Sequence, residues 1–154
     1  MSANITIRLA DLGDMTDILE WRNDEHTRQM FRSGSHVCPD DNEKWFRCAM
    51  KSARRNIFIS QVGDDKICMV RFDEFEPRHY DVSINMNPTW RGRRLSEQVL
   101  AGSVEFLQTF KTVELITAEV KNMNLASKKI FVSNGFVLIY EDGEYCFYEK
   151  GAIP

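Results

Sequence analysis

Hydrophobic and polar positions follow two periods along this chain, and each period predicts one kind of element. Alternation of apolar and polar residues is typical of a half-buried strand, whereas apolar residues spaced three and four apart are typical of a helix. Alternation and β-prone residues predict strands over 5–9, 57–62, 66–72, 80–86, 114–120, 136–140 and 145–149. Helices are expected between most of them.

Helical spacing marks four segments. Apolar residues on one face predict helices over about 14–25, 40–50, 95–110 and 125–134. Asp14 is available to cap the first helix, and Asp40, followed three residues later by Glu43, predicts a capping box for the second. Gly135 stands where a glycine commonly ends a helix.

Turn residues separate these elements. Gly63 and the Asp142-Gly143 pair favour tight turns that join neighbouring strands into antiparallel hairpins. Pro88 ends a strand because it has no backbone N–H to donate. With no repeat or low-complexity tract, the sequence predicts an α/β (α+β) fold in one domain over 1–154.

Composition narrows the functional class. The chain has 154 residues, of which 43% are hydrophobic, enough for the core of one domain. Its 20 basic and 23 acidic side chains give a net charge of -3, which predicts neither a nucleic-acid nor a membrane partner. No apolar run approaches the ~20 residues of a membrane span, and a secretory signal is absent, so a cytoplasmic protein is expected.

The cysteines do not indicate a metal site. Cys38, Cys48, Cys68 and Cys146 are scattered, without CxxC spacing or nearby histidines. Buried thiols are therefore expected, and no metal is predicted.

The segment from Arg91 to Ser96 is the first candidate for chemistry. It follows a predicted strand and opens a helix, so backbone N–H groups and the positive end of the helix dipole point to one place. Arg91, Arg93 and Arg94 would add cations suited to phosphate. The alternative is a solvated basic turn without a ligand.

In residues 86–96 the chain resembles the GNAT superfamily of acetyltransferases, whose cofactor loop follows a Q/R-x-x-G-x-G/A pattern after a strand. Arg91 takes the Q/R position, and Gly92 is a common extra glycine. Arg94 and Ser96 stand where the pattern has glycine and Gly/Ala. The resemblance implies a mostly antiparallel central sheet flanked by about four helices.

A second GNAT pattern, N-x-x-S-x-x-[LI]-[YF]-x-x-x-G-F, is matched from Asn124 to Phe136. By resemblance, Asn124 and Ser127 would contact the pantetheine arm, although Asn124 could equally be a helix cap only. The aromatic position, in many GNAT enzymes a tyrosine that protonates the departing thiolate, is Phe131 here.

Acetyl-CoA is the cofactor that the resemblance implies, as a co-substrate. Its predicted contacts lie on the strand end, the basic loop and the later helix, at Met86, Asn87, Arg91, Gly92, Arg93, Arg94, Leu95, Ser96, Asn124, Ser127 and Phe131. Backbone N–H groups of 93–96 would hold the pyrophosphate. An N–H near Met86 or Asn87 would stabilise the carbonyl oxygen as it becomes negative.

Transfer of an acetyl group to an amine needs a proton acceptor and, if CoA leaves with help, a proton donor. Asp81 is the first candidate for the base, with Glu74 and His79 as alternatives. Tyr148 is the acid candidate, and Tyr140, Tyr145 or water could replace it.

The acceptor is a small-molecule amine in this interpretation. Residues Trp21, Arg22, Asn23 and Trp45 resemble the acceptor side of GNATs that acetylate nucleotide-linked amino sugars, and Arg22 with Arg28 could contact a diphosphate or be ordinary surface cations. Acetylation of a protein N-terminus and a GNAT fold that only binds CoA or a metabolite are the alternatives. Apolar positions over 137–148 predict a possible homodimer contact.

Overall fold

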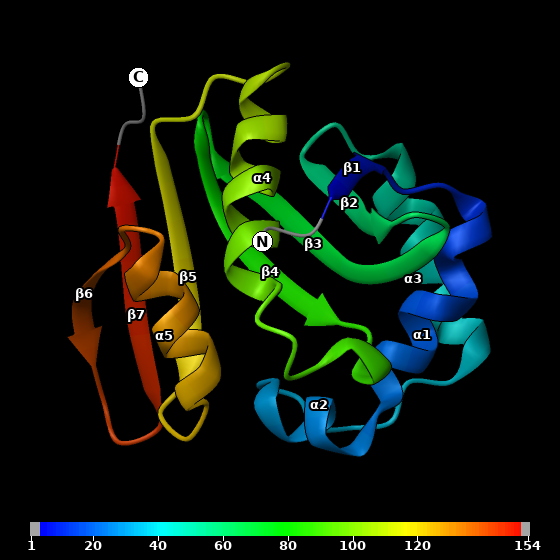
Figure 1. Ribbon diagram of the computed structural model, residues 1–154, viewed down its shortest axis with the longest axis horizontal. Coiled ribbons are helices and arrows are strands. Elements are labelled where there is room, and N and C mark those ends of the chain that lie inside the picture. Colours follow the sequence, from blue (N-terminus) through cyan, green and yellow to red (C-terminus); the bar gives the residue numbers. More distant parts are fainter. Residues whose placement is uncertain (1–3, 152–154) are drawn as a thin grey trace.

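A computed structural model describes residues 4–151, which fold around one mixed sheet (Figure 1). The strand order is β1-β2-β3-β4-β5-β7-β6. The strands are β1 (Ile5–Leu9), β2 (Arg55–Val62), β3 (Asp65–Glu76), β4 (His79–Met86), β5 (Leu115–Lys121), β6 (Val137–Glu141) and β7 (Tyr145–Gly151). All neighbours are antiparallel except β4 and β5. The predicted α/β class and mostly antiparallel sheet are confirmed.

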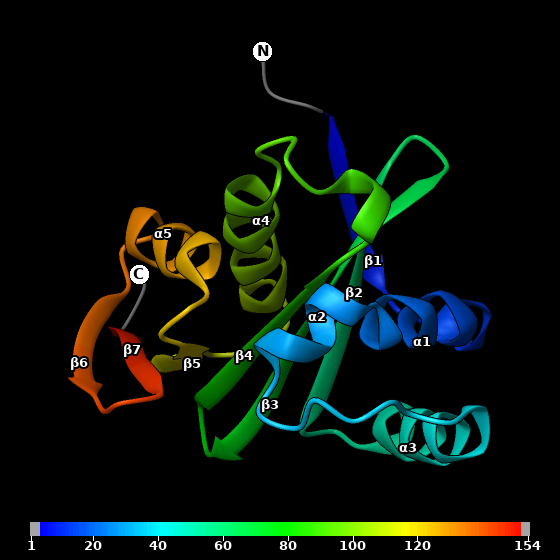
Figure 2. The same cartoon turned by 90° about the horizontal axis from the view of Figure 1, so that it is seen from below.

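Helices cover both faces of the sheet. The described residues form α1 (Met15–Asn23), α2 (Glu25–Met30), α3 (Pro39–Lys51), α4 (Ser96–Gln108) and α5 (Leu125–Ser133), with short 3-10 turns η1 (Leu12–Asp14) and η2 (Pro88–Trp90). Figure 2 shows α4 and α5 on one side of the sheet and α3 on the other. Five α-helices thus replace the expected four. No helix within 4–151 is long and apolar enough to cross a lipid bilayer.

Two hydrophobic cores form because successive residues of a strand point to opposite faces. On the α4 side, Phe58 packs among Leu100, Leu107 and other fully buried side chains. On the α1 and α3 side, Ile59 and its β2 neighbour Ile57 join a separate cluster that also holds Trp21 and Phe46. Both faces of β2 are therefore buried, which fixes its register between two layers.

The predicted first helix corresponds to α1, and α2, which was not predicted, follows it directly. α1 ends at Asn23, and the Asp24 carboxylate accepts the N–H of Thr27 at 3.0 Å to cap the separate helix α2. The chain turns at Asp24 because this side chain satisfies an N–H that a continuous helix would bond internally. α2 lies at the end of the sheet where β4 finishes (Figure 1).

Both predicted caps are wrong in detail. Asp14 precedes α1 without capping it, because its carboxylate accepts the N–H of Asp11 and two bonds from Arg8. α3 begins at Pro39 after Cys38, with no side-chain cap, so Asp40 lies inside the first turn. Proline suits that first position because its missing N–H would have had no helical partner.

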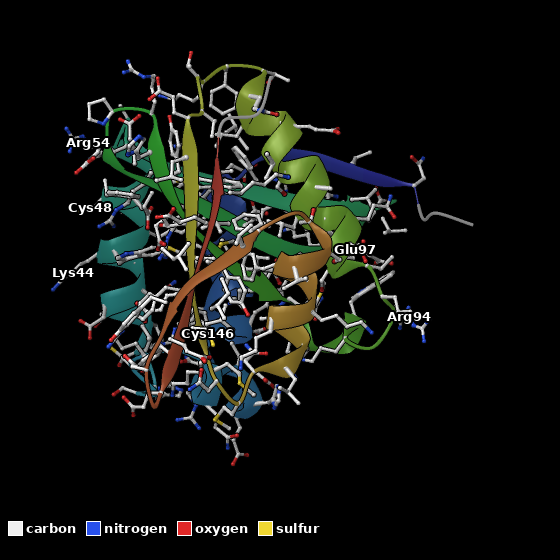
Figure 3. The ribbon with its side chains drawn as sticks, turned by 90° about the vertical axis from the view of Figure 1, so that its left-hand side faces the viewer. Lys44, Cys48, Arg54, Arg94, Glu97 and Cys146 are labelled. Carbon is white, nitrogen blue, oxygen red and sulfur yellow. The ribbon has the colours of Figure 1, made fainter. Side chains whose placement is uncertain are left out.

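The cysteines are only partly buried thiols. Cys68 and Cys146 are buried, as predicted, whereas Cys38 and Cys48 are exposed. Figure 3 shows Cys48 beside Lys44 on the outer side of α3. Among residues 4–151 no group of three or more His, Cys, Asp or Glu side chains is placed to hold a metal ion.

The edge of the sheet is apolar. β6 exposes Val137, Leu138, Ile139 and Tyr140, each by 44% or more. The homodimer contact predicted for this region stays a prediction.

A buried ion cluster ties the first turn to the sheet. Asp14 is fully buried, and its carboxylate lies 2.8 Å from Arg8 Nη1 and 2.9 Å from Lys66 Nζ. Burial raises the pKa of Asp14, but the hydrogen bonds from Arg8, the Asp11 backbone and Lys66 outweigh it and hold the pKa well below its usual range.

Asp14→Asn is expected to lower the free energy of unfolding by on the order of 2 kcal/mol, because two cations lose their buried partner. The lowered folded-state pKa means that this contribution is complete above the unfolded pKa of about 4 and is lost as pH falls below it. Urea unfolding between neutral and acid pH measures both effects. Glu105→Gln, at an exposed α4 position, is the control and should match wild type. Equal stability of Asp14→Asn and wild type would contradict the assignment.

Candidate active site

A groove opens where β4 and β5 separate. Their parallel register holds for three pairs, His79 with Leu115, Tyr80 with Ile116 and Asp81 with Thr117. Beyond these pairs the strands diverge toward α2, as Figure 1 shows. The groove between them has a volume of about 420 Å³ and is lined by the second half of β4, the end of β5, α5 and α2.

The backbone of β4 presents N–H groups to this groove. Asn87 donates its N–H to Ile67 O at 2.8 Å, on the β3 side. Because N–H groups of a strand point alternately to its two neighbours, those of Ile84 and Met86 point toward the diverging β5. Of the two N–H groups predicted as oxyanion donors, that of Met86 therefore points to the groove and that of Asn87 does not. The Asn87 side chain is also committed, since it donates to Lys66 O and accepts from Thr89 N.

The basic loop ends the groove. Gly92 and Ser96 line it, and α4 begins at Ser96 without a side-chain cap, so the helix start keeps its donors available. Gly92 and Arg94 both have left-handed backbones, with φ of 75° and 59°. Figure 3 shows the Arg94 side chain extending outward from the loop. The side chains of Arg93, Arg94 and Leu95 do not line the groove.

Arg91 links the loop to α2. Its Nη2 forms an ion pair with Asp24 and donates to Thr27 Oγ1 at 2.6 Å. Desolvation raises the pKa of Asp24, but the hydrogen bonds from Arg91 and Thr27 lower it by more. The pKa of Asp24 is therefore below its usual value. Arg91 lines the groove as predicted, yet part of its charge is already balanced within the protein.

α5 supplies the opposite wall. Asn124 Oδ1 accepts the N–H of Ser127 at 3.2 Å, so the capping role is confirmed, and both residues line the groove. Phe131 also lines it, with its ring 6.2 Å from that of Tyr148, measured between centroids. Tyr148 is buried in the core and does not line the groove, whereas Tyr145 does.

Asp81 lies on the groove wall. Its carboxylate accepts the hydroxyl of Thr117 at 2.9 Å. Neighbouring protein atoms partly desolvate this carboxylate, and the desolvation raises its pKa. The hydrogen bond from Thr117 lowers the pKa and the nearby charges of Asp73 and Glu119 raise it, so the net shift is upward. Glu74 of β3 and His79 at the start of β4 lie at the opposite end of β4 from the fork and do not line the groove.

A second pocket of about 510 Å³ lies on the α1 and α3 side of the sheet. Arg22 and Trp45, two of the residues predicted for the acceptor side, both line it. Trp21 and Asn23, predicted for the same side, do not line it but line another pocket, of about 710 Å³, with Asn87. Asn23 there exchanges two 2.8 Å hydrogen bonds with the Val37 backbone. The second pocket and the groove share five wall residues, Phe31, Arg32, Arg71, Ser83 and Asn85, and are therefore continuous.

Several wall residues were not predicted. Arg32 reaches from the segment after α2 to Glu119 of β5 at 2.6 Å and lies over the Tyr145 ring. Arg71 pairs with Asp73 at 2.8 Å. Asn85 is 2% exposed, and neither its amide oxygen nor its amide nitrogen has a partner among the described residues. Arg71 and Asn85 each interrupt a strand that is otherwise rich in apolar residues. This interruption is the sequence signal that could have identified them.

A forked sheet whose groove ends at an uncapped, basic helix start has features that suit an anionic, extended ligand. The sequence model of the acetyltransferase (GNAT) domain matches residues 4–137. The chain belongs to this family of acetyltransferases. Comparison with curated proteins gives no match.

Solved structures show the same fold. Spermidine N-acetyltransferase from Vibrio cholerae, in complex with CoA and spermine, is 15% identical, with a TM-score of 0.86 over 96% of this chain and 95% of that one. The putative acetyltransferase yncA from Salmonella typhimurium, with acetyl-CoA, is 17% identical, with a TM-score of 0.78 over 96% and 93%. Campylobacter jejuni N-acetyltransferase PseH, with acetyl coenzyme A, is 12% identical, with a TM-score of 0.74 over 96% and 98%.

The left-handed backbone of Arg94 predicts that glycine is more stabilising than alanine at this position. A side chain in this conformation costs about 1 kcal/mol, whereas glycine adopts it freely. Arg94→Gly should therefore be more stable than Arg94→Ala by about 1 kcal/mol, although alanine usually favours the folded state over glycine. Both variants remove the same charge, so chemical denaturation isolates the backbone effect.

The neighbouring arginine gives the control. Arg93 has no positive φ and lies with its guanidinium over the Trp90 ring at 4.3 Å. Arg93→Gly should be no more stable than Arg93→Ala. If glycine were no more stable than alanine at position 94 as well, the positive φ of Arg94 would carry no energetic cost.

Proposed function

We propose that this GNAT domain is an acetyl-CoA-dependent enzyme that transfers the acetyl group to a primary amine of a small molecule, with a nucleotide-linked amino sugar as the leading candidate. The observation that carries the proposal is the fork between β4 and β5, which ends at the uncapped start of α4. An extended ligand with a phosphate at one end matches both features.

The residues fit acetyl-CoA along the whole groove. Gly92 and Ser96 leave space beside the helix start for the pyrophosphate, and the loop arginines add positive charge. The free edge of β4 would bond the pantetheine amides as an added strand does. Asn124 and Ser127 face it from α5. When bound, the cofactor supplies a thioester, whose carbonyl carbon accepts an amine.

Proton transfer falls to Asp81. The amine must lose a proton to attack, and a carboxylate with a raised pKa is a better base than an ordinary aspartate. The Met86 N–H, which points into the fork, would stabilise the negative charge that develops on the carbonyl oxygen. Glu74 and His79 are the weaker candidates because they line neither cavity.

The departing thiolate has no obvious acid at position 131, because Phe131 carries no hydroxyl. A thiol pKa of about 8.5 makes CoA a good leaving group, so catalysis does not require one. Tyr145 is favoured over Tyr148 as a proton donor, since only Tyr145 lines the groove. A domain that binds the cofactor without turnover is the second candidate, and Phe131 together with Arg94 favours it.

The acceptor assignment rests on the second pocket. Arg22 and Trp45 offer a cation and an aromatic face, the chemistry that suits a phosphorylated sugar. Acetylation of a protein N-terminus would favour acidic residues near the acceptor amine, and residues 73–76 form an acidic segment. The Asp73 carboxylate is paired with Arg71, however, and no carboxylate of this segment lines either cavity. The small-molecule alternative is therefore preferred.

Titration calorimetry with acetyl-CoA and with CoA, at low ionic strength, tests the cofactor proposal. Micromolar binding is expected. Ser96→Asp should weaken it by at least about tenfold, because a carboxylate at the helix start repels pyrophosphate. The same carboxylate interacts well with the helix dipole, so thermal stability should not fall. Ser96→Ala is the matched control and should bind within a few-fold of wild type. No binding at millimolar ligand would reject the acetyltransferase proposal.

The pH profile of kcat/KM tests the base. Asp81→Asn should reduce kcat/KM by about 100-fold. Thr117→Val removes a hydrogen bond that lowers the pKa of Asp81, so this pKa should rise further. Because the base must be ionised, the acidic limb of the profile should move to higher pH while the plateau is retained. An unmoved limb in Thr117→Val would assign the base elsewhere.

A further inference from the structure

The acceptor pocket carries positive charge that the protein does not balance. Arg22 donates Nη2 to Ser33 O at 2.7 Å and lies over the Phe31 ring at 4.4 Å. Within the described part of the chain, neither Arg22 nor Arg28 has a carboxylate within 4 Å. Two of their nitrogens, Arg22 Nη1 and Arg28 Nε, are buried without a partner.

Like charges meet at this position. Burial lowers the pKa of Arg22, and the nearby charges of Arg28 and Arg71 lower it further. A guanidinium stays protonated even so, which leaves an unfavourable positive potential in the pocket. Orphaned donors and uncompensated cations are both costly, and an anion would relieve both.

The acids close to the pocket do not supply that anion. Asp73 is paired with Arg71, and Glu119 is paired with Arg32. Asp41 lines the pocket from α3, is exposed and makes no ion pair among residues 4–151, while His36 lies on the facing segment. With Arg71 and Arg32 each paired, the two arginines without a carboxylate partner, Arg22 and Arg28, outnumber Asp41 and leave the wall positive.

We propose that the acceptor amine also bears an anionic group, a phosphoryl or a carboxylate, which binds at Arg22 with the charges of Arg28 and Arg71 behind it. This inference rests on the proposed function and specifies the substrate class of its acceptor pocket. A polycationic amine such as spermine, the ligand of the Vibrio cholerae structure, would be repelled at this wall.

The sheet register sets the span of such a substrate. Arg71 is paired with Ser83 and Asp73 with Asp81, so Arg71 and Asp81 are diagonal neighbours on one face. Side chains in that relation are separated by roughly 7–8 Å. An amine at Asp81 and an anion beside Arg71 would therefore lie several bonds apart on one small molecule.

Titration calorimetry with inorganic pyrophosphate tests this site. The protein is first saturated with CoA so that pyrophosphate cannot bind at the cofactor loop. Wild type is expected to bind, and Arg22→Gln should weaken binding by at least about tenfold. Arg22→Lys should fall between them, because it keeps the charge but loses the planar fork. Arg47→Gln, on the exposed side of α3 and outside both cavities, is the control and should match wild type. Thermal unfolding verifies that each variant is folded.

Succinate in place of pyrophosphate distinguishes the two kinds of anion. Stronger Arg22-dependent binding of one of them assigns the group as carboxylate or phosphoryl. Binding of neither, or binding that Arg22→Gln leaves unchanged, would overturn the proposal. If CoA itself fails to bind, the proposed function falls, and the same titration of free wild type against Arg22→Gln still tests the anion site.

Acetylation rates give an independent reading. Glucosamine 6-phosphate should be used with at least about tenfold higher kcat/KM than glucosamine, and the advantage should disappear in Arg22→Gln. Equal use of the two amines by wild type, or a preference for spermidine, would also overturn the proposal.

Discussion

The interruption of one strand pair determines how the rest of this molecule is arranged. β4 and β5 are bonded for three residue pairs and then separate. Strands β1–β4 stay together on one side of the fork and β5–β7 on the other, while α4 and α5 pack against one another in front of it. The core under α4 and α5 holds buried residues from both sides of the fork, including Val82 of β4 and Val120 of β5, and so joins the two sides. The N–H groups on the free edge of β4 need partners, and an extended ligand can provide them.

A short segment after α1 connects the two sides of the fork. Asp24 at its beginning is paired with Arg91 of the basic loop, and Arg32 at its end is paired with Glu119 of β5. Lys121 adds a bond of 2.9 Å to Gln29 O. The segment therefore contacts the expected phosphate end and the expected acceptor end at once. Groups that would bind the two substrates are held in one geometry by these ion pairs.

The strands and many groove residues could be predicted from the sequence, but the side-chain contacts that connect them could not. Alternation predicted all seven strands, and the two motifs pointed to Met86, Gly92, Ser96, Asn124 and Ser127, which do line the groove or direct an N–H into it. α2 was missed because six residues give no helical period, and its start depends on a cap at Asp24. Arg71 and Asn85 were missed because alternation shows that residues share a face, not what that face meets.

The position of Arg71 shows why such residues escape a sequence pattern and still govern the site. The face of β3 and β4 that holds Met69 and Asn85 continues to Arg71 and Ser83, and then to Asp73 and Asp81. Along this face the charge changes from the uncharged pair Met69 and Asn85, through the cation Arg71, to the acids Asp73 and Asp81. An acid next to the fork favours removal of a proton, and cations farther along favour an anion. The same register that stabilises the sheet would order the chemistry of the proposed acceptor, because a substrate lying on this face would meet each charge at a fixed distance from the next.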